Sequence, residues 1–437
     1  MTKLNLDFEW IDPAEAKGPE LRATWASLQI SFEGQTITRL IDDASRSVRS
    51  HLFLPLYPVA EWLATHWWFL FNEFETPGRS TSAHYDKRHD LRYGAEGFAL
   101  PSLTIQPLGE RNRLAWRSVR LEAQNLEFAA SGSGHIPADE LRQTFSDFIN
   151  AILQRLSEQG VENTLLQTEW NGIQATDPQE LEFCSAAASL GLDPYSLTDE
   201  KQREIMEVSE RLPASLWPDF FAFADSAAMP EQAKQVLAAL ARSGKNKVNL
   251  EPLKALRNDL RPSNSIQGSP WEQGYQFARD LRERLNLNGD KLTSLSSLGS
   301  ALGIPGKKLE SAIIKVVSHP GTFSALVATN SRESPVFAVP DRRGAATRFA
   351  FCRALFEYLT TPADQPLLVT RARSERQKRN RAFAAEFLVP ADRLQEALQG
   401  QVVGDEEIDD VAIAFGVSPS VIRHQMENHG LAHSFPD

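Results

Sequence analysis

The amino-acid sequence predicts an α+β protein, and three observations support this class. Apolar and polar residues alternate near the N-terminus, helical apolar spacing dominates the middle of the chain, and short apolar runs return before a last group of helices. We therefore expect a β-rich domain over residues 1–135, a helical domain over 136–262, and an α+β domain over 271–437 that ends in a helical tail.

The N-terminal region has the alternation of half-buried β-strands. Residues 26–32 alternate between apolar and polar or small side chains, and residues 33–35 (Glu-Gly-Gln) are typical of a turn before 36–40. Similar alternation predicts further strands of an antiparallel sheet at 103–105, 114–116 and 121–128. One helix is expected to pack on this sheet, over 58–73, because tryptophan and leucine recur there at helical spacing.

The middle region has the spacing of amphipathic helices. Apolar residues recur at intervals of three and four over 141–156, and Gly160 is placed to end that helix. Asp177-Pro178 is a start signal for a second helix, which Gly191 ends. Further helices are expected over 198–212, 230–243 and 271–285. Residues 261–270 are rich in turn-forming residues and are the expected linker.

Composition narrows the possible classes of protein. A hydrophobic content of 42% and a charged content of 24% are typical of a soluble globular protein. The apolar run 52–74 is interrupted by charged residues and prolines, and the N-terminus has no basic-then-apolar leader, so we expect a cytoplasmic protein without a membrane span. The two cysteines, Cys184 and Cys352, exclude a disulfide scaffold and are expected in the core. A net charge of -11 disfavours wrapping of nucleic acid by the whole surface.

Short apolar runs predict three strands before a helix near residue 350: 312–317, 323–328 and 336–339. The helix is RFAFCRALFEYL (348–359), and two further blocks follow it, RAFAAEFLVP (381–390) and VAIAFGVSPSVIRHQMENHGL (411–431). In order and spacing, these blocks resemble the ImmA/IrrE family of bacterial zinc endopeptidases. The resemblance implies a small zincin-like α+β core with a helical tail.

An active peptidase of this kind needs two histidines four residues apart on one helix, a glutamate beside the first as general base, and a further glutamate as third zinc ligand. Aligned with the family, the histidine positions fall on Arg353 and Glu357, the general base on Ala354 and the third ligand on Gln377. An arginine and a neutral amide are poor zinc ligands, and alanine cannot relay a proton. The resemblance therefore implies a pseudo-enzyme without a catalytic residue, a bound metal or a cofactor.

Arg353 and Glu357 lie four residues apart on the face that would hold the metal. If the helix is buried there, we expect a salt bridge between them to fill the space that zinc takes in active relatives. The alternative is an ordinary pair on the protein surface.

A cluster of basic residues is the strongest electrostatic feature of the sequence. Its members are Arg371, Arg373, Arg376, Lys378, Arg379 and Arg381. One interpretation is a solvated helix face. The other is a surface that binds an acidic protein partner or a phosphate backbone.

Two groups of histidines deserve comparison with metal sites. His84 and His89 lie in a polar run that we expect to be a solvated loop rather than a site, with a binding surface as the alternative. His424, His429 and His433 follow near the C-terminus, where Gly430 is expected to break the helix, so helix-end and tail residues are favoured over metal ligands.

The segment 409–425 has helix-turn-helix spacing, with a turn at Gly416, Ser418 as N-cap and Pro419 in the first helical turn. Such spacing occurs in DNA-binding proteins. Acidic residues surround the segment, however, so packing on the peptidase-like core is the favoured interpretation.

The resemblance thus implies a non-catalytic protein that binds a protein partner as a sensor, adaptor or regulatory subunit. Active relatives cut helix-turn-helix repressors in stress response, mobile-element control or phage defence, so the expected partner is an effector or repressor encoded nearby. Two alternatives remain: a nucleic-acid-binding regulator that uses residues 371–381, and a metallopeptidase with a non-standard site around His84. No membrane partner is expected.

Overall fold

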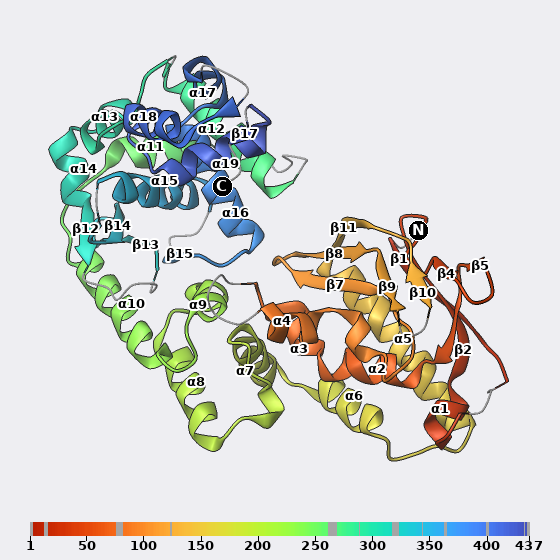
Figure 1. The fold of residues 1–437 in the computed structure, drawn as a ribbon. Helices are drawn as coiled ribbons and strands as arrows, with labels where there is room; N and C mark the ends of the chain where they lie inside the picture. Colours follow the sequence, from red (N-terminus) through yellow and green to blue (C-terminus); the bar gives the residue numbers. More distant parts are fainter. Residues whose placement is uncertain are drawn as a thin grey trace. The chain divides into compact units, whose positions relative to one another are not determined.

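Helices and small sheets alternate along the chain, which confirms the predicted α+β class (Figure 1). The computed structural model describes these residues: 3–12, 16–75, 82–122, 125–260, 269–287, 289–316, 323–342, 344–361, 365–398, 402–431 and 433–434. By its internal contacts the chain divides into two units, Met1–Ile205 and Met206–Asp437. The three-domain division at residues 135 and 262 stays a prediction, and most of the expected linker, 261–268, lies outside the described residues.

The N-terminal unit contains three small antiparallel sheets. The first is formed by β1 (Leu4–Trp10), β2 (Trp25–Phe32), β3 (Gln35–Thr36) and β6 (Leu52–Pro55). The second is formed by β4 (Leu40–Asp42), β5 (Ser47–Arg49), β9 (Val119–Leu121) and β10 (Leu126–Phe128), and the third by β7 (Ser102–Pro107), β8 (Arg111–Arg117) and β11 (Gly132–Pro137). Alternate residues of β2 are buried, as its sequence predicts.

Two expectations about these strands were wrong. We expected one sheet and find three, because alternation specifies which side chains face the core and not which strands pair. We also expected a single strand over 121–128. The chain instead reverses there, so that β9 and β10 pair in antiparallel fashion, and Asn125 takes the positive φ of 54° that asparagine tolerates in a turn.

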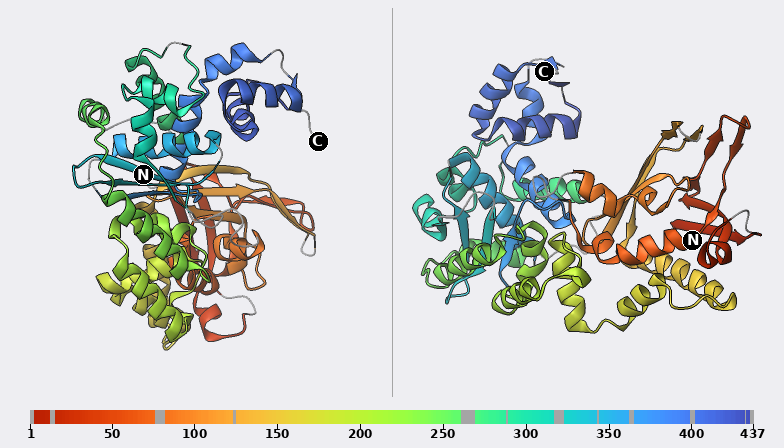
Figure 2. Two further views of the ribbon diagram at one scale, coloured as in Figure 1. Left: turned by 90° about the vertical axis from the view of Figure 1, so that its left-hand side faces the viewer. Right: turned by 60° about the horizontal axis from the view of Figure 1, so that its bottom comes forward.

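The helices of this unit cover its strands with a shared core. They are α1 (Pro19–Ala23), α2 (Tyr57–Thr65), α3 (Trp67–Asn72), α4 (Ser82–His89), the 3-10 turn η1 (Leu91–Gly94), α5 (Ala138–Glu158), α6 (Leu165–Ala175), α7 (Pro178–Ser189) and the 3-10 turn η3 (Pro194–Ser196). The next helix, α8 (Asp199–Arg211), contains the boundary between the two units. Helix α2 lies side by side with α5 and α6 (Figures 1 and 2). The predicted ends at Gly160 and Gly191 are confirmed, since both glycines have positive φ just after α5 and α7.

The single helix expected over 58–73 is divided at His66. This residue leaves helical geometry with a ψ of 7°, which ends α2 and begins α3. Its Nδ1 lies 2.9 Å from the Trp62 carbonyl, so the side chain competes for a backbone acceptor of the helix. Apolar spacing alone does not show such a local break.

The C-terminal unit contains a four-stranded mixed sheet in the order β12-β14-β13-β15: β12 (Ile313–Val316), β14 (Pro335–Pro340), β13 (Ala325–Thr329) and β15 (Leu367–Val369). The three strands expected before the motif helix are thereby confirmed within one or two residues. Every residue of β14 is buried, so both faces of the sheet are covered. Helices α10 (Met229–Gly244) and α15 (Gly344–Thr360) both pack on it.

The remaining elements of this unit are mostly helical: the 3-10 turn η4 (Ala214–Leu216), α9 (Trp217–Phe223), α11 (Glu251–Asp259), α12 (Pro270–Arg284), α13 (Leu295–Ala301), α14 (Gly306–Ala312), α16 (Glu375–Leu388), α17 (Ala391–Ala397), β16 (Val402–Val403), α18 (Asp405–Phe415), α19 (Pro419–His429) and β17 (His433–Ser434). Helices α15, α16, α18 and α19 contribute to one hydrophobic core. Cys184 and Cys352 are both buried, as expected, and burial raises the pKa of each thiol.

Helices α12 and α16 approach unusually closely at Gly274. A Cβ added there would lie 2.3 Å from the carbonyl oxygen of Arg379 and 2.9 Å from the Cβ of Ala382. Backbone atoms on a packed helix cannot move aside as a flexible side chain can. Glycine is therefore required at this crossing.

We expect Gly274→Ala to lower the free energy of unfolding by about 1–3 kcal/mol, because the added methyl group overpacks the crossing. Urea denaturation measures this change. Gly172→Ala is the matched control, since Gly172 lies inside α6 with open space around it and alanine favours helix there by about 0.5–1 kcal/mol. A Gly274→Ala protein as stable as the parent would contradict the close approach.

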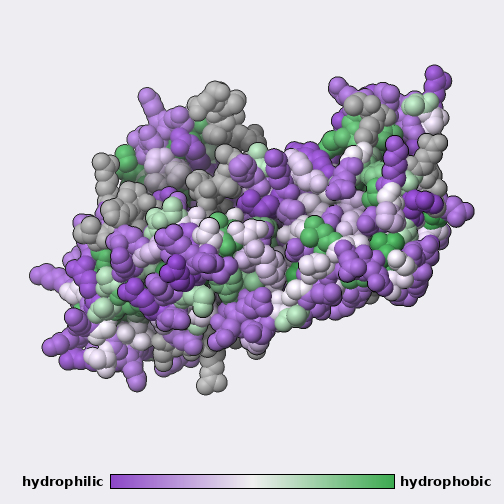
Figure 3. Space-filling model, turned by 90° about the horizontal axis from the view of Figure 1, so that it is seen from below, coloured by the Kyte–Doolittle hydropathy of each residue, from purple (hydrophilic) through white to green (hydrophobic). Residues whose placement is uncertain are grey.

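The described helices include none with the length and apolar content needed to cross a bilayer. On the face drawn in Figure 3, outside the grey atoms, hydrophobic residues are scattered among hydrophilic ones. No large apolar patch is visible on that face.

Candidate functional site

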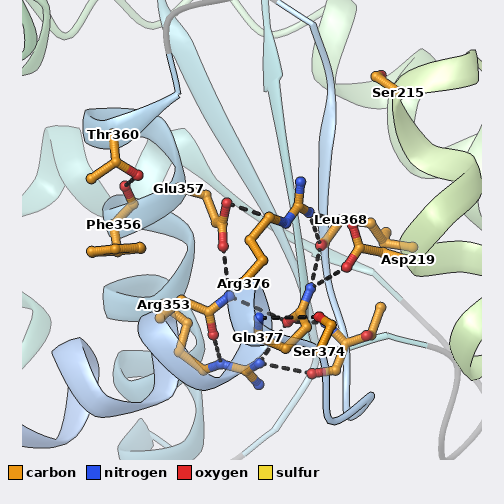
Figure 4. A network of polar contacts seen from close by, with 12 residues as sticks. Ser215, Asp219, Arg353, Phe356, Glu357, Thr360, Leu368, Ser374, Arg376 and Gln377 are labelled. Carbon is orange, nitrogen blue, oxygen red and sulfur yellow. Dashed lines mark hydrogen bonds and ion pairs between the residues drawn. The ribbon is translucent and has the colours of Figure 1, made fainter. Parts of the chain in front are cut away.

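Helix α15 places two charged residues inside the C-terminal unit. Residues 351–359 are all buried, so the helix is enclosed on every side rather than amphipathic. Arg353 is 4% exposed and Glu357 is 1% exposed, while Ala354 packs fully buried in the hydrophobic core. The surface-pair alternative is therefore wrong, and both side chains need buried polar partners (Figure 4).

Arg353 finds its partners on α16 and at the end of β15. Its Nε donates to Oδ1 of Asn380 at 2.7 Å. Its Nη2 donates to the carbonyl oxygen of Thr370 at 2.7 Å and to Oε1 of Gln377 at 2.8 Å. The hydroxyl of Ser374 caps α16 and accepts from the backbone N–H of Gln377, which fixes where this helix begins.

Gln377 is the centre of the polar network. Its Oε1 also accepts from the backbone N–H of Thr370 at 2.9 Å and from Nδ2 of Asn380 at 3.2 Å. Its Nε2 donates to Oδ1 of Asp219 at 2.6 Å and to the Leu368 carbonyl at 3.0 Å. Both ends of this buried amide are fully satisfied.

The carboxylate of Glu357 is held by Asn380 and Arg376. Its Oε1 accepts from Nδ2 of Asn380 at 2.6 Å, and its Oε2 lies 3.5 Å from Nε of Arg376. The guanidinium of Arg376 continues to Asp219, with Nη2 at 2.5 Å from Oδ2. Figure 4 shows Arg376 between the two carboxylates.

The direct salt bridge expected between Arg353 and Glu357 is wrong within the described residues. Asn380 bridges the two side chains by donating to Glu357 and accepting from Arg353. The guanidinium of Arg353 is instead drawn to the Thr370 carbonyl and the Gln377 amide, which lie nearer β15 and α16. This outcome agrees with the order of the two residues, because an arginine four residues before a glutamate forms a weaker helical ion pair than the reverse order.

The network contains two carboxylates, Asp219 and Glu357, and two guanidinium groups, Arg353 and Arg376, so its formal charges balance. Burial raises the pKa of both carboxyl groups, although Arg376 works against the shift in each. Burial also lowers the pKa of Arg353. For Arg376, burial alone would lower the pKa, but Glu357 and Asp219 outweigh it and raise the pKa. The opposite charges therefore stabilise one another, and this attraction offsets part of the free-energy cost of removing them from water.

The residues that meet here do not fit a zinc ion. Zinc sites use imidazole, thiolate or free carboxylate ligands, and the network supplies neither of the first two. Its carboxylate and amide oxygens already accept from Arg353, Arg376 or Asn380. A cation would have to displace two guanidinium groups. Elsewhere, the described residues contain no group of three or more His, Cys, Asp or Glu side chains placed to hold a metal.

The stability of this unit should depend on the titration of Glu357. Because its pKa is raised in the fold, its favourable contribution is complete below its ordinary value of 4.5 and is lost as pH rises through the folded-state pKa. We expect the stability advantage of the parent over Glu357→Gln to be larger at pH 4.5 than at pH 8, and urea midpoints of both proteins at both pH values measure it. An advantage that grows with pH would contradict the burial effect.

The basic cluster is dispersed by the fold. Arg376 turns into the network, and Arg381 donates through Nε to the Gln377 carbonyl and through Nη2 to the Ala372 carbonyl. Arg371 and Arg373 are exposed in the segment between β15 and α16. The other two members, Lys378 and Arg379, are half-buried on the helix. A surface made by all six cations together does not exist, while the use of the exposed ones stays a prediction.

The histidines expected in a loop are on a helix. His84 and His89 belong to α4, where His84 is exposed and His89 is buried. His89 lies 3.1 Å from Oε2 of Glu73 through Nε2 and donates through Nδ1 to the Ile105 carbonyl at 2.7 Å. The loop expectation was wrong because a helical run of polar residues has no apolar period to reveal it.

The C-terminal predictions fared better. Gly416 and Gly430 end α18 and α19 in left-handed geometry, and α19 begins with Ser418 and Pro419 as expected. Helix α19 packs on α16 and α17, so the helix pair belongs to the core of the unit. His424 and His429 both lie on α19, and His433 follows in β17.

Sequence reasoning missed Asp219 as a member of the network. The signal was an acid inside the apolar run Trp217–Phe223, where a charge needs a partner if the run is buried. Nothing in the nearby sequence identifies that partner, because Gln377 is 158 residues away.

The aligned positions Arg353, Glu357 and Gln377 do come together in the fold. No family model and no curated protein matches this chain.

Proposed function

We propose that this chain is a non-catalytic protein, similar in its C-terminal unit to the ImmA/IrrE peptidases, that acts by binding a protein partner in the bacterial cytoplasm. One observation carries the proposal. The positions that the resemblance assigns to the metal ligands, 353, 357 and 377, meet in one buried network although they come from two helices.

The chemistry at these positions supports a loss of peptidase activity. The general-base position is Ala354, which has no proton-transferring group. The ligand positions are Arg353, Glu357 and Gln377, and their polar atoms stabilise the fold by bonding to one another or to Asn380. Such a site keeps helices α15 and α16 together. A sensor, adaptor or regulatory subunit in stress response, mobile-element control or phage defence needs that scaffold without the reaction.

The exposed part of the basic cluster suits an acidic partner. Arg371 and Arg373 are exposed in the segment before α16, on either side of Ala372, whose carbonyl accepts a hydrogen bond from Arg381. The whole chain has a net charge of -11, so this local positive surface favours a specific contact over general attraction to polyanions. Nucleic acid remains the alternative ligand of the same cations.

A competition between the two ligand classes tests this proposal. We expect the tagged chain to retain one protein partner, identified from the genomic neighbourhood and purified, after the salt is raised. Arg371→Glu with Arg373→Glu should weaken that complex, while Glu406→Gln on α18 serves as an exposed control. Gel-shift binding of nucleic acid that falls steeply with salt, together with no retained protein partner, would favour the alternative and overturn the proposal. Arg376 is unsuitable for this test because its substitution disturbs the buried network.

A further inference from the structure

A pocket of about 330 Å³ lies in the C-terminal unit between helices α12, α15, α16 and α19. It is separate from the buried network, and its size suits a small organic molecule. The residues that decide its chemistry are Trp271, Tyr275, Phe349, Lys378, Arg381 and Gln425. They supply three kinds of contact: aromatic surface, positive charge and one buried acceptor.

The acceptor is the side-chain carbonyl of Gln425. This residue is 0% exposed, and its Nε2 donates to Oε2 of Glu386 at 3.0 Å and to the Val389 carbonyl at 2.9 Å. Because both partners are acceptors, the amide orientation is fixed. Its Oε1 has no hydrogen-bond partner among the described residues. A buried acceptor without a donor is costly, so a ligand N–H at this point would be favoured.

Positive charge comes from α16. Lys378 and Arg381 both line the pocket, and none of the lining residues is acidic. Burial lowers the pKa of Arg381 to about 10, so the side chain still carries its charge at neutral pH. In a chain with an excess of acids, a pocket that contains two cations and no acidic residue favours an anionic ligand.

The aromatic residues define the shape of the ligand. Trp271 is 41% exposed, which is unusual for a tryptophan, while Tyr275 is buried below it on the same helix. Phe349 adds a third ring from α15. Such surfaces stack on planar rings, and a nucleobase gains about 1–3 kcal/mol from one aromatic partner.

We infer that this pocket binds a nucleoside monophosphate, whose base would stack on Trp271 and donate an N–H to Gln425 while its phosphate meets Lys378 and Arg381. A small anion alone would leave the aromatic surface and the acceptor unused. A neutral ring alone would leave the cations unused. This inference does not rest on the proposed partner-binding function.

Calorimetric titration of the full chain with AMP, GMP, CMP and UMP tests the inference. We expect saturable binding of at least one of them with one site per chain, and weaker binding of ribose 5-phosphate and of the free nucleoside. Trp271→Ala should weaken binding about 5- to 150-fold through lost stacking. Lys378→Gln should also weaken binding, because it removes a cation that faces the phosphate. Ile413→Ala is the matched control, because it truncates an exposed apolar side chain on α18 outside the pocket.

Circular dichroism and thermal melting establish that each variant is folded before it is titrated. Absence of binding for all four nucleotides in the folded parent would overturn the inference. So would equal affinity of the parent and Trp271→Ala, or equal affinity of a nucleotide and ribose 5-phosphate. Affinity that rises with the length of a single-stranded oligonucleotide would show a nucleic-acid surface instead of a small-ligand pocket.

Discussion

Arg353→Met should lower the free energy of unfolding of the C-terminal unit by about 3–5 kcal/mol. Methionine retains the apolar stem but removes the guanidinium. Asn380, Gln377 and Thr370 would each lose a donor in a buried site. Two buried carboxylates would then face Arg376 as their remaining guanidinium partner in the network. Urea denaturation followed by circular dichroism measures the loss.

Arg371→Met is the matched control for this experiment. It makes the same chemical change six residues before Gln377, in the segment just ahead of α16, at an exposed position. Exposed substitutions of this kind change stability by no more than about 0.5 kcal/mol. If both substitutions have the same small effect, the network does not hold α15 against α16, and the structural role assigned to Arg353 is wrong.

A zinc site should appear when the four aligned positions are converted together. The variant Arg353→His, Ala354→Glu, Glu357→His and Gln377→Glu supplies two imidazoles at i and i+4 and a carboxylate on the facing helix. Arg353 and Gln377 are in direct contact through Nη2 and Oε1 at 2.8 Å, so the replaced side chains face one another across the same buried space. We expect one equivalent of zinc per chain and a melting temperature that rises with zinc.

The size of this effect follows from mass action. At free zinc 1,000 times the dissociation constant, binding adds about 4.1 kcal/mol of stability. The control carries the same substitutions but keeps Gln377, and it should bind zinc more weakly because it lacks the third ligand, which is the charged one. The experiment remains informative even if the metal-free variant folds poorly, because folding that depends on zinc is itself the expected signal. Zinc that leaves the melting curve of the four-site variant unchanged would contradict the alignment.

Local signals predicted much of the C-terminal unit. Gly416, Ser418, Pro419 and Gly430 each carry a conformational preference of their own, and the boundaries of α18 and α19 follow them. Periodicity also located β12, β13 and β14 to within one or two residues, although it did not give their order in the sheet. Strand pairing in the N-terminal unit depends on distant partners and escaped prediction. The break at His66 and the helix that contains His84 also escaped prediction, because apolar periodicity shows neither a local break nor a helix made of polar residues.

The candidate site was also predicted only in part. Alignment to a family pattern identified Arg353, Glu357 and Gln377, which do lie together, but it could not show what each side chain bonds. Asp219 enters from α9 through contacts that span more than half the unit's sequence. Arg376 was counted as a surface cation because charge runs usually face solvent. Its guanidinium instead pairs with two buried carboxylates, Asp219 and Glu357, which are distant from it in the sequence.

A charge-balanced polar network is proposed to occupy the positions that the resemblance to zinc peptidases assigns to the metal ligands. Elemental analysis of the full chain, purified without added metal and without a metal-affinity tag, tests it most directly. The account predicts far less than one equivalent of zinc or any other transition metal per chain. A stoichiometric transition metal that is lost in Glu357→Gln would contradict it, because that carboxylate would then be a ligand rather than a partner of Arg376 and Asn380.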